Sequence, residues 1–130
     1  MQDFKLPHNH GHNIEKLLEQ LPHTDDFLVV SDLFRLLGDS SRLRIFWILC
    51  HCEECVINLS AMMSMSSPAV SHHLKQLRTA GLIVSRRDGK EVYYKAANVK
   101  KVEMLHNMLE TLVVLTCPGN ECIVKEPDAF

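Results

Sequence analysis

The sequence predicts a mainly α-helical fold with one small β-hairpin, an α+β fold of the winged helix-turn-helix type. Apolar residues recur at helical spacing through most of the 130 residues. A turn at residues 64–66 separates two short helical segments, as in a helix-turn-helix. Asp88-Gly89 lies between two stretches of strand composition and predicts a hairpin, the wing. The length suits a single domain with its own core.

Four helices are expected before the turn, at residues 13–21, 24–37, 40–50 and 56–63. Pro22 and Gly38 follow the first two and end them. Asp39 or Ser40 can cap the third helix. The segment between the third and fourth helices is expected to be a loop in which Cys52 and Cys55 are exposed, whereas Cys50, at the end of the third helix, could equally be an inert buried thiol.

The elements after the turn complete the winged helix. Ser67 is expected to cap the next helix, with Pro68 at its first position, where the missing N–H costs nothing. Strands are expected at residues 82–86 and 91–95, and a last helix at 99–116. The apolar stripe of the last helix is wider than one domain needs, which favours a dimer face, although the helix could pack within its own domain.

The chain divides into three expected segments. Residues 1–12 form a flexible arm that carries histidines, and residues 13–116 form the DNA-binding and dimerisation domain. Residues 117–130 form an acidic tail that carries cysteines. No apolar run is long enough to span a membrane, and the start MQDFKLPHNHGH lacks the apolar stretch of a signal peptide. A cytoplasmic protein with reduced thiols is therefore expected, and its five cysteines favour metal or redox chemistry over disulfides.

Charge is distributed unevenly along the sequence, although the net charge is only −2. Residues 64–101 carry eight Lys/Arg and two Asp/Glu, a net +6, between flanks of −4 each. A basic segment between acidic flanks is typical of a polyanion site on one face, and equally of a solvated basic surface.

The helix after the turn has the size of a helix that enters the major groove, and the hairpin would reach the adjacent backbone. Phosphates supply most of the affinity in such complexes, and bases supply specificity. The basic side chains expected at phosphates are Lys75, Arg86, Arg87 and Lys90. Those expected at bases or in the groove are Ser67, Ser71 and His72. Read singly, each could be an ordinary surface residue; the hairpin favours DNA contact for the set.

Three stretches of the sequence resemble the ArsR/SmtB family of bacterial repressors. They are LFRLLGDSSRLRIFWIL (33–49), SSPAVSHHLKQLRTAGLI (66–83) and SRRDGKEVYYK (85–95). The resemblance implies a homodimer that dimerises through its first and last helices. It further implies a sequence-specific repressor, not an enzyme, that reads an imperfect palindrome in double-stranded DNA and releases it when a metal ion or an oxidant reaches a sensing site.

The resemblance also indicates where a metal sensor would lie. The family positions on the last helix hold poor ligands here, Asn98, Lys100, Thr111 and Val114. The family's cysteine motif corresponds to EECVINL, in which Cys55 matches and the second cysteine is replaced by Ile57. Thiolate and imidazole suit Zn²⁺, Cd²⁺, Cu⁺ or As(III), the expected effectors. The available ligands are Cys50, Cys52 and Cys55 with His8, His10 and His12 of the arm.

Other uses of the same residues stay open. Cys50 and Cys117 resemble the dithiol of family members that sense oxidants or persulfides. A structural zinc site with constitutive DNA binding would use Cys52, Cys55, Cys117 and Cys122. Glu103 and His106 share a helical face and could form an improvised site. CEEC is also a Cys-x-x-Cys motif, but the βαβ setting of a thioredoxin-like enzyme is not expected here. The sequence thus predicts a repressor that a thiophilic metal ion releases from its operator.

Overall fold

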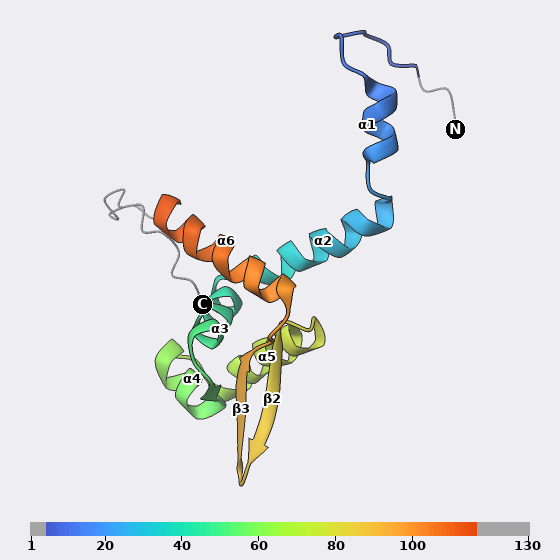
Figure 1. The fold of residues 1–130 in the computed structure, drawn as a ribbon. Helices are drawn as coiled ribbons and strands as arrows, with labels where there is room; N and C mark the ends of the chain where they lie inside the picture. The colour runs from blue at the N-terminus through green and yellow to red at the C-terminus, as the bar shows by residue number, and fades with distance from the viewer. Residues whose placement is uncertain (1–4, 117–130) are drawn as a thin grey trace. The chain divides into compact units, whose positions relative to one another are not determined.

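The computed structural model describes residues 5–116, and within them the chain forms six helices and three strands (Figure 1). In chain order the elements are α1, α2, α3, β1, α4, α5, β2, β3 and α6. The chain divides into an N-terminal unit, residues 1–34, and a larger unit, residues 35–130. The larger unit contains the predicted winged helix-turn-helix.

The N-terminal unit holds α1 (Ile14–Gln20) and most of α2 (Thr24–Leu37). Asn13 caps α1, because its side chain accepts a hydrogen bond from the Lys16 N–H at 3.1 Å. Asp26 similarly accepts from the His23 N–H just before α2, at 3.2 Å. Neither helix contains a buried residue, and most of their apolar side chains are exposed, whereas Ile14, Leu33, Leu36 and Leu37 are half-buried.

The core of the larger unit lies between α3 (Ser40–His51), α4 (Val56–Met63) and α5 (Ser67–Thr79). Its largest fully buried side chains are Ile45, Phe46, Leu59, Val70, Leu74, Leu77, Leu82 and Ile83. Asp39 caps α3 by accepting from the Arg42 N–H at 2.9 Å. The helices predicted from periodicity and caps are confirmed, with bounds that differ by at most one residue at each end.

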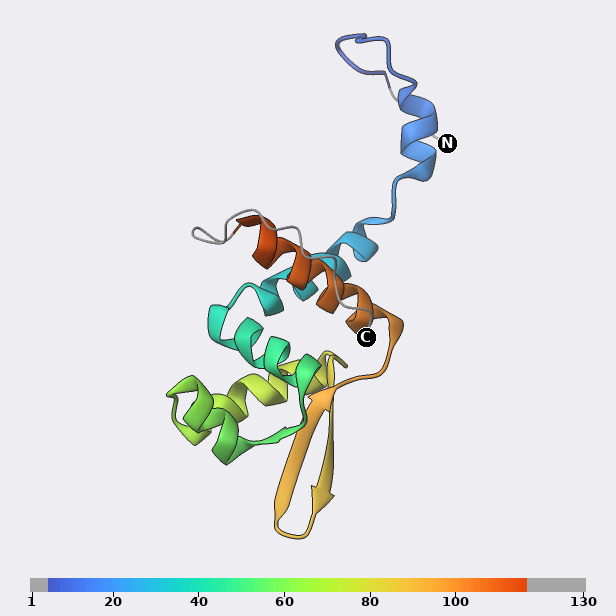
Figure 2. The ribbon, with the colours of Figure 1, turned by 60° about the vertical axis from the view of Figure 1, so that its left-hand side comes forward.

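The wing is the antiparallel hairpin β2 (Ile83–Asp88) and β3 (Glu91–Ala96), which projects from the helices (Figures 1 and 2). Asp88 pairs with Glu91, so Gly89 and Lys90 form the loop, and Gly89 adopts a φ of +63° that glycine tolerates. The predicted hairpin is confirmed.

A third strand, β1 (Glu54–Cys55), corrects the expectation of a loop between α3 and α4. It pairs with β3 in antiparallel register, Glu54 opposite Tyr94 and Cys55 opposite Tyr93. The sheet order is therefore β1-β3-β2, with the cysteine segment at one edge. Two residues are too few to show strand periodicity in a sequence.

The last helix, α6 (Lys100–Thr116), packs against α3 through Val102, Leu105 and His106, which are buried. Its outer face leaves Met104, Met108, Leu112 and Leu115 exposed by 40% or more. Among the described residues, no helix combines the length and the apolar character needed to cross a membrane.

Candidate nucleic-acid interface and ligand cluster

A short turn sets the start of α5, the candidate reading helix. Ser64 ends α4 in the left-handed conformation, with a φ of +53°. Ser66 then caps α5, and its Oγ accepts from the Ala69 N–H at 3.3 Å. This corrects the prediction that Ser67 is the cap. Ser67 is the first helical residue, and its hydroxyl lies 3.2 Å from that of Ser60.

The outer face of α5 carries the predicted groove residues. Ser71, His72 and Lys75 are all exposed, whereas Val70, Leu74 and Leu77 on the opposite face are buried. Because an α-helix has 3.6 residues per turn, Ser71, His72 and Lys75 lie within about a third of the circumference of α5. One side of α5 is thus fixed in the core while the other presents hydroxyl, imidazole and ammonium groups to solvent.

Arg42 of α3 holds α5 in place, a role that sequence reasoning missed. Its Nε donates to the Leu36 carbonyl at 2.5 Å, and its Nη1 donates to Gln76 and lies 3.4 Å from His73 Nδ1. Gln76, expected on the outer face, is half-buried by this contact. Desolvation of His73, more than its neighbouring charges, lowers its pKa. His73 therefore belongs to the support of α5, and His72 to its exposed face.

The wing carries four exposed basic side chains, Arg86, Arg87, Lys90 and Lys95, and Arg86 is the most constrained of them. Its Nε lies 3.0 Å from both carboxylate oxygens of Glu53, and its guanidinium lies 4.8 Å from the centre of the Tyr93 ring. The hydrogen bond to Glu53 is the main cause that raises the Arg86 pKa. Within residues 5–116, Arg87 and Lys90 have no carboxylate at ion-pair distance. Of the three wing cations predicted at phosphates, they are the two without a competing carboxylate.

The three described cysteines occupy different environments. Cys50, at the end of α3, is half-buried, and desolvation together with the charge of Glu110 raises its pKa to about 12. Cys52 is exposed and its thiol donates to the Ile48 carbonyl at 3.5 Å. Desolvation and Glu54 raise its pKa as well. Cys55, the second residue of β1, is buried, so the expectation that it is exposed is wrong.

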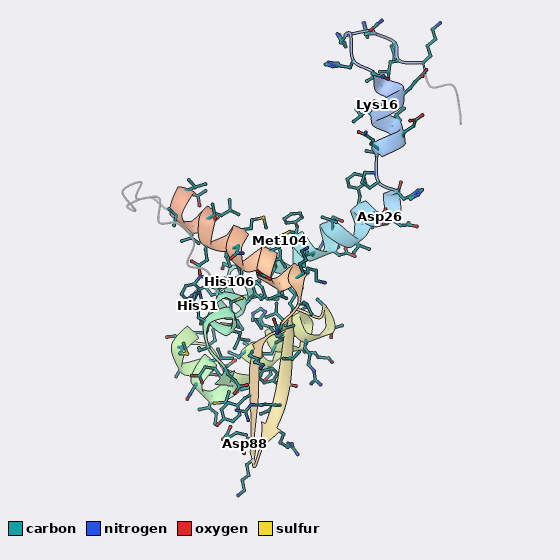
Figure 3. All side chains as sticks on the ribbon, viewed as in Figure 1. Lys16, Asp26, His51, Asp88, Met104 and His106 are labelled. Carbon is teal, nitrogen blue, oxygen red and sulfur yellow. The ribbon has the colours of Figure 1, made fainter. Side chains whose placement is uncertain are left out.

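Three other ligand side chains converge where α3 meets α6. The Nε2 atom of His51 lies 2.7 Å from Glu110 Oε1, and the Nε2 atom of His106 lies 3.0 Å from the same oxygen. The two Nε2 atoms are 3.1 Å apart. Figure 3 shows both imidazoles at the junction of the two helices. Among residues 5–116 this is the one group of three His, Cys, Asp or Glu side chains close enough to share an ion.

The partner of His106 differs from the one considered in the sequence. His106 is buried and faces α3, and it pairs with Glu110 one helical turn later. Glu103 is exposed and lines a shallow groove along the outer face of α6 with Met104 and Met108. Burial of the Glu110 carboxyl opposes its ionisation, but hydrogen bonds and attraction from the two histidines outweigh this and lower its pKa.

The remaining predicted ligands lie elsewhere in the chain. His8, His10 and His12 are exposed in the N-terminal unit, where the His8 and His10 ring centres are 6.0 Å apart. The suggested partners Cys117 and Cys122 lie outside the described residues.

Comparison with known proteins decides the family. A model described as "Bacterial regulatory protein, arsR family" matches residues 39–85, from the cap of α3 into β2. The chain is 36% identical over 89 residues to a "Transcriptional repressor SmtB homolog" of Synechocystis sp., covering 68% of this chain and 67% of that protein. The chain belongs to the ArsR/SmtB family.

A second curated relative and a solved structure are also similar to this chain. The chain is 38% identical over 77 residues to the "Cadmium resistance transcriptional regulatory protein CadC" of Listeria innocua, covering 58% of this chain and 65% of CadC. Several curated relatives are thus matched over 57% to 65% of their length. The structure of HlyU from Vibrio cholerae superposes with a TM-score of 0.62 at 28% identity, covering 74% of this chain and all of that one.

The ArsR/SmtB relatives that the chain matches are named as transcriptional regulators and repressors. The segment that the family model matches contains α5 and the start of the wing, as well as His51. His106 and Glu110 lie beyond it on α6. The cluster therefore joins the matched part of the chain to a helix outside it.

Proposed function

We propose that this chain is a homodimeric repressor of transcription that binds an imperfect palindrome and releases it when a thiophilic metal ion binds. The observation that carries the proposal is the outer face of α5, whose exposed polar side chains lie beside a basic wing in one folded unit. The match to a protein named as a transcriptional repressor supports the direction of regulation.

In the proposed complex, α5 lies in the major groove. Ser67, Ser71 and His72 are near its N-terminal end, where reading helices of this type contact base edges. Lys75, Arg87 and Lys90 are proposed to contact phosphates, which supply most of the affinity. Arg86 would join them where a phosphate displaces Glu53 from its guanidinium.

The outer face of α6 is the proposed dimer surface. Its exposed Met104, Met108 and Leu112 form an apolar strip along a groove, which is more apolar surface than a free helix normally leaves in water. A two-fold dimer would place two copies of α5 about one helical turn of DNA apart, roughly 34 Å. Met108→Glu should convert the dimer to monomers in sedimentation and abolish tight operator binding.

The proposed effector is an ion such as Zn²⁺, Cd²⁺, Cu⁺ or As(III). The name of CadC, a cadmium resistance regulator, supports this class of signal. Cys50, Cys52 and Cys55 precede or form β1, which pairs with the wing strand β3, so an ion held there could move the wing. His8, His10 and His12 are the proposed additional ligands from the arm. The raised pKa values of Cys50 and Cys52 mean that a proton must be lost on binding.

The proposal is tested by measuring the affinity for the operator with and without each effector. A duplex selected from a randomised pool is titrated with the metal-free protein, then with Zn²⁺, Cd²⁺, Cu⁺, As(III) or a persulfide donor. The proposal expects a loss of affinity of at least about tenfold with one or more metals. If none of the ions changes affinity, the metal-sensor part is wrong, whereas absence of sequence-specific binding would remove the repressor function itself.

Two other functions use the same thiols, and the titration separates them. A Cys50–Cys117 dithiol sensor would respond to the persulfide donor and not to metals; the raised pKa of Cys50 gives it no support. A structural zinc protein would unfold when a chelator removes its ion, whereas a sensor stays folded and binds DNA more tightly.

A further inference from the structure

We infer that His51, His106 and Glu110 form a binding site for a divalent ion of borderline softness, with Zn²⁺ as the best-fitting ion. The site lies within one subunit and joins α3 to α6. It contains no thiolate, so it differs from the cysteine site proposed above. Metal binding at this site stands by itself; its effect on DNA rests on the proposed function.

The three ligand atoms already have nearly the spacing that zinc requires. Zinc bonds to nitrogen and oxygen are about 2.0–2.1 Å, so the ligand atoms around a tetrahedral ion are roughly 3.3 Å apart. The distances among His51 Nε2, His106 Nε2 and Glu110 Oε1 are 2.7, 3.0 and 3.1 Å. An ion would need to spread them by only a few tenths of an ångström.

The backbone and the packing hold the ligands in place. His106 and Glu110 are four residues apart on α6, so helical geometry directs them to one side. The imidazole of His106 is almost fully buried against α3. His51 is the last residue of α3, and Trp47, one turn earlier, packs on its ring at 4.2 Å between centres. Side chains that are already held in one rotamer lose less conformational entropy when they bind an ion.

The exposure of the site leaves room for a fourth ligand. His51 is exposed and Glu110 half-buried, so the cluster opens to solvent on one side and is closed by His106 on the other. Two imidazoles and one carboxylate with an open position suit Zn²⁺, Co²⁺ and Ni²⁺. They do not suit As(III) or Cu⁺, which select thiolates.

The position of the site gives it a route to the wing. His51 is followed after two residues by β1, whose Glu54 and Cys55 pair with the wing strand β3. The outer face of the same α6 is the proposed dimer surface. An ion that ties α6 to the end of α3 would restrain both the wing and the dimer geometry.

The chain supplies its own reporter for binding. Trp47 is the single tryptophan of the chain and touches His51, so paramagnetic Co²⁺ or Ni²⁺ at the cluster should quench its fluorescence. An ion held by the cysteines, of which Cys50 adjoins His51, would differ in two ways: it would add a sulfur-to-cobalt charge-transfer band in the near ultraviolet, and its quenching would survive the loss of the Glu110 carboxylate.

The experiment titrates the full, reduced, metal-free chain with Co²⁺, Ni²⁺ and Zn²⁺, following Trp47 fluorescence, cobalt absorption and side-chain ¹⁵N shifts of the histidines. His51→Ala, at an exposed position, and Glu110→Gln should each weaken the quenching titration by at least about 10- to 100-fold. Glu103→Gln and His23→Ala are the matched controls and should bind as the parent does, because neither side chain belongs to the cluster. Thermal melts check that all variants are folded.

The outcomes separate the site from its regulatory effect. Saturable quenching with shifts at His51 and His106, lost in both cluster variants, supports the site. Absence of quenching, or quenching that survives both variants, overturns it whatever the DNA titration shows. If the cluster binds zinc but operator affinity is the same in His51→Ala and parent protein across the zinc titration, the site stands and its link to DNA release is wrong.

Discussion

Cys55 lies directly opposite Tyr93, so the cysteine segment is the third strand of the wing sheet. The neighbouring pair places Glu54 opposite Tyr94, and Glu53 one residue earlier binds Arg86 of β2. A displacement of the segment that follows α3 would therefore pass to the wing through paired backbone and through an ion pair.

Arg87→Ala is expected to weaken binding to all duplexes alike. Arg87 is exposed on the wing and has no ion-pair partner within residues 5–116, so a phosphate is its natural ligand. Loss of one phosphate contact should lower the slope of log affinity against log salt by about one per protomer. Fluorescence anisotropy at several salt concentrations measures both effects, with Lys16→Ala as the control. Altered preference among sequences would instead indicate a base contact.

Glu53→Gln is expected to strengthen DNA binding several-fold. The change releases Arg86 from its hydrogen-bonded carboxylate and should steepen the salt dependence by about 0.9 per protomer. Glu91→Gln removes the same charge from the wing without releasing an arginine, and is the matched control. Equal effects of the two variants would show that only net charge matters and that Arg86 does not reach a phosphate.

Cys50 should be the slow thiol toward iodoacetamide in the folded protein. Its pKa of about 12 leaves little thiolate at pH 8, and the stronger nucleophilicity of that thiolate offsets only part of the loss. Alkylation should be on the order of 50-fold slower than in denaturant and should accelerate as the pH rises. Fragment-ion mass spectrometry compares Cys50 with exposed Cys52. Equal labelling rates of Cys50 in the folded and unfolded chain would contradict the assigned environment.

Ser66→Ala should destabilise the protein more than Ser67→Ala. Ser66 caps α5 through the Ala69 N–H, and loss of such a cap costs about 1 kcal/mol. Ser67 sits one residue inside the helix and contacts only the Ser60 hydroxyl in the described hydrogen bonds, so its removal should cost less. Urea unfolding of the two variants gives the difference, and the reverse order would restore Ser67 as the cap.

Arg42→Ala should lower the free energy of unfolding by about 1–3 kcal/mol, because the Leu36 carbonyl and the Gln76 amide oxygen both lose a charged donor. Arg44→Ala, two residues later and exposed, should change stability by less than about 0.5 kcal/mol. Denaturant titrations compare the two variants. Equal values would mean that Arg42 does not anchor α5.

Local chemistry made most elements predictable. The helix Val56–Met63 matches its predicted bounds, and Asp88-Gly89 marked the hairpin. The cap of α5 was misplaced by one residue, because serines occupy three of the four positions 64–67 and only the backbone conformation decides which one caps. The two-residue β1 carries no period of its own, so tertiary pairing alone creates it.

The ligand cluster shows where sequence reasoning ends. The spacing of His106 and Glu110 was visible as an i, i+4 pair, but helical period gives the face of a side chain and not its partner. The partner, His51, is 55 residues away in the chain, so no local spacing links it to the pair. Arg42 was hidden in the same way, because its partners His73 and Gln76 are 31 and 34 residues away in the chain.

The short link between α3 and β1 makes this part of the chain intolerant of changes in length. Only Cys52 and Glu53 separate His51 from the paired strand. Since side chains alternate along a strand, one inserted or deleted residue here would exchange the sides of Glu54 and Cys55, exposing the thiol and turning the carboxylate inward. Insertions and deletions in CHCEEC would therefore disturb the wing itself.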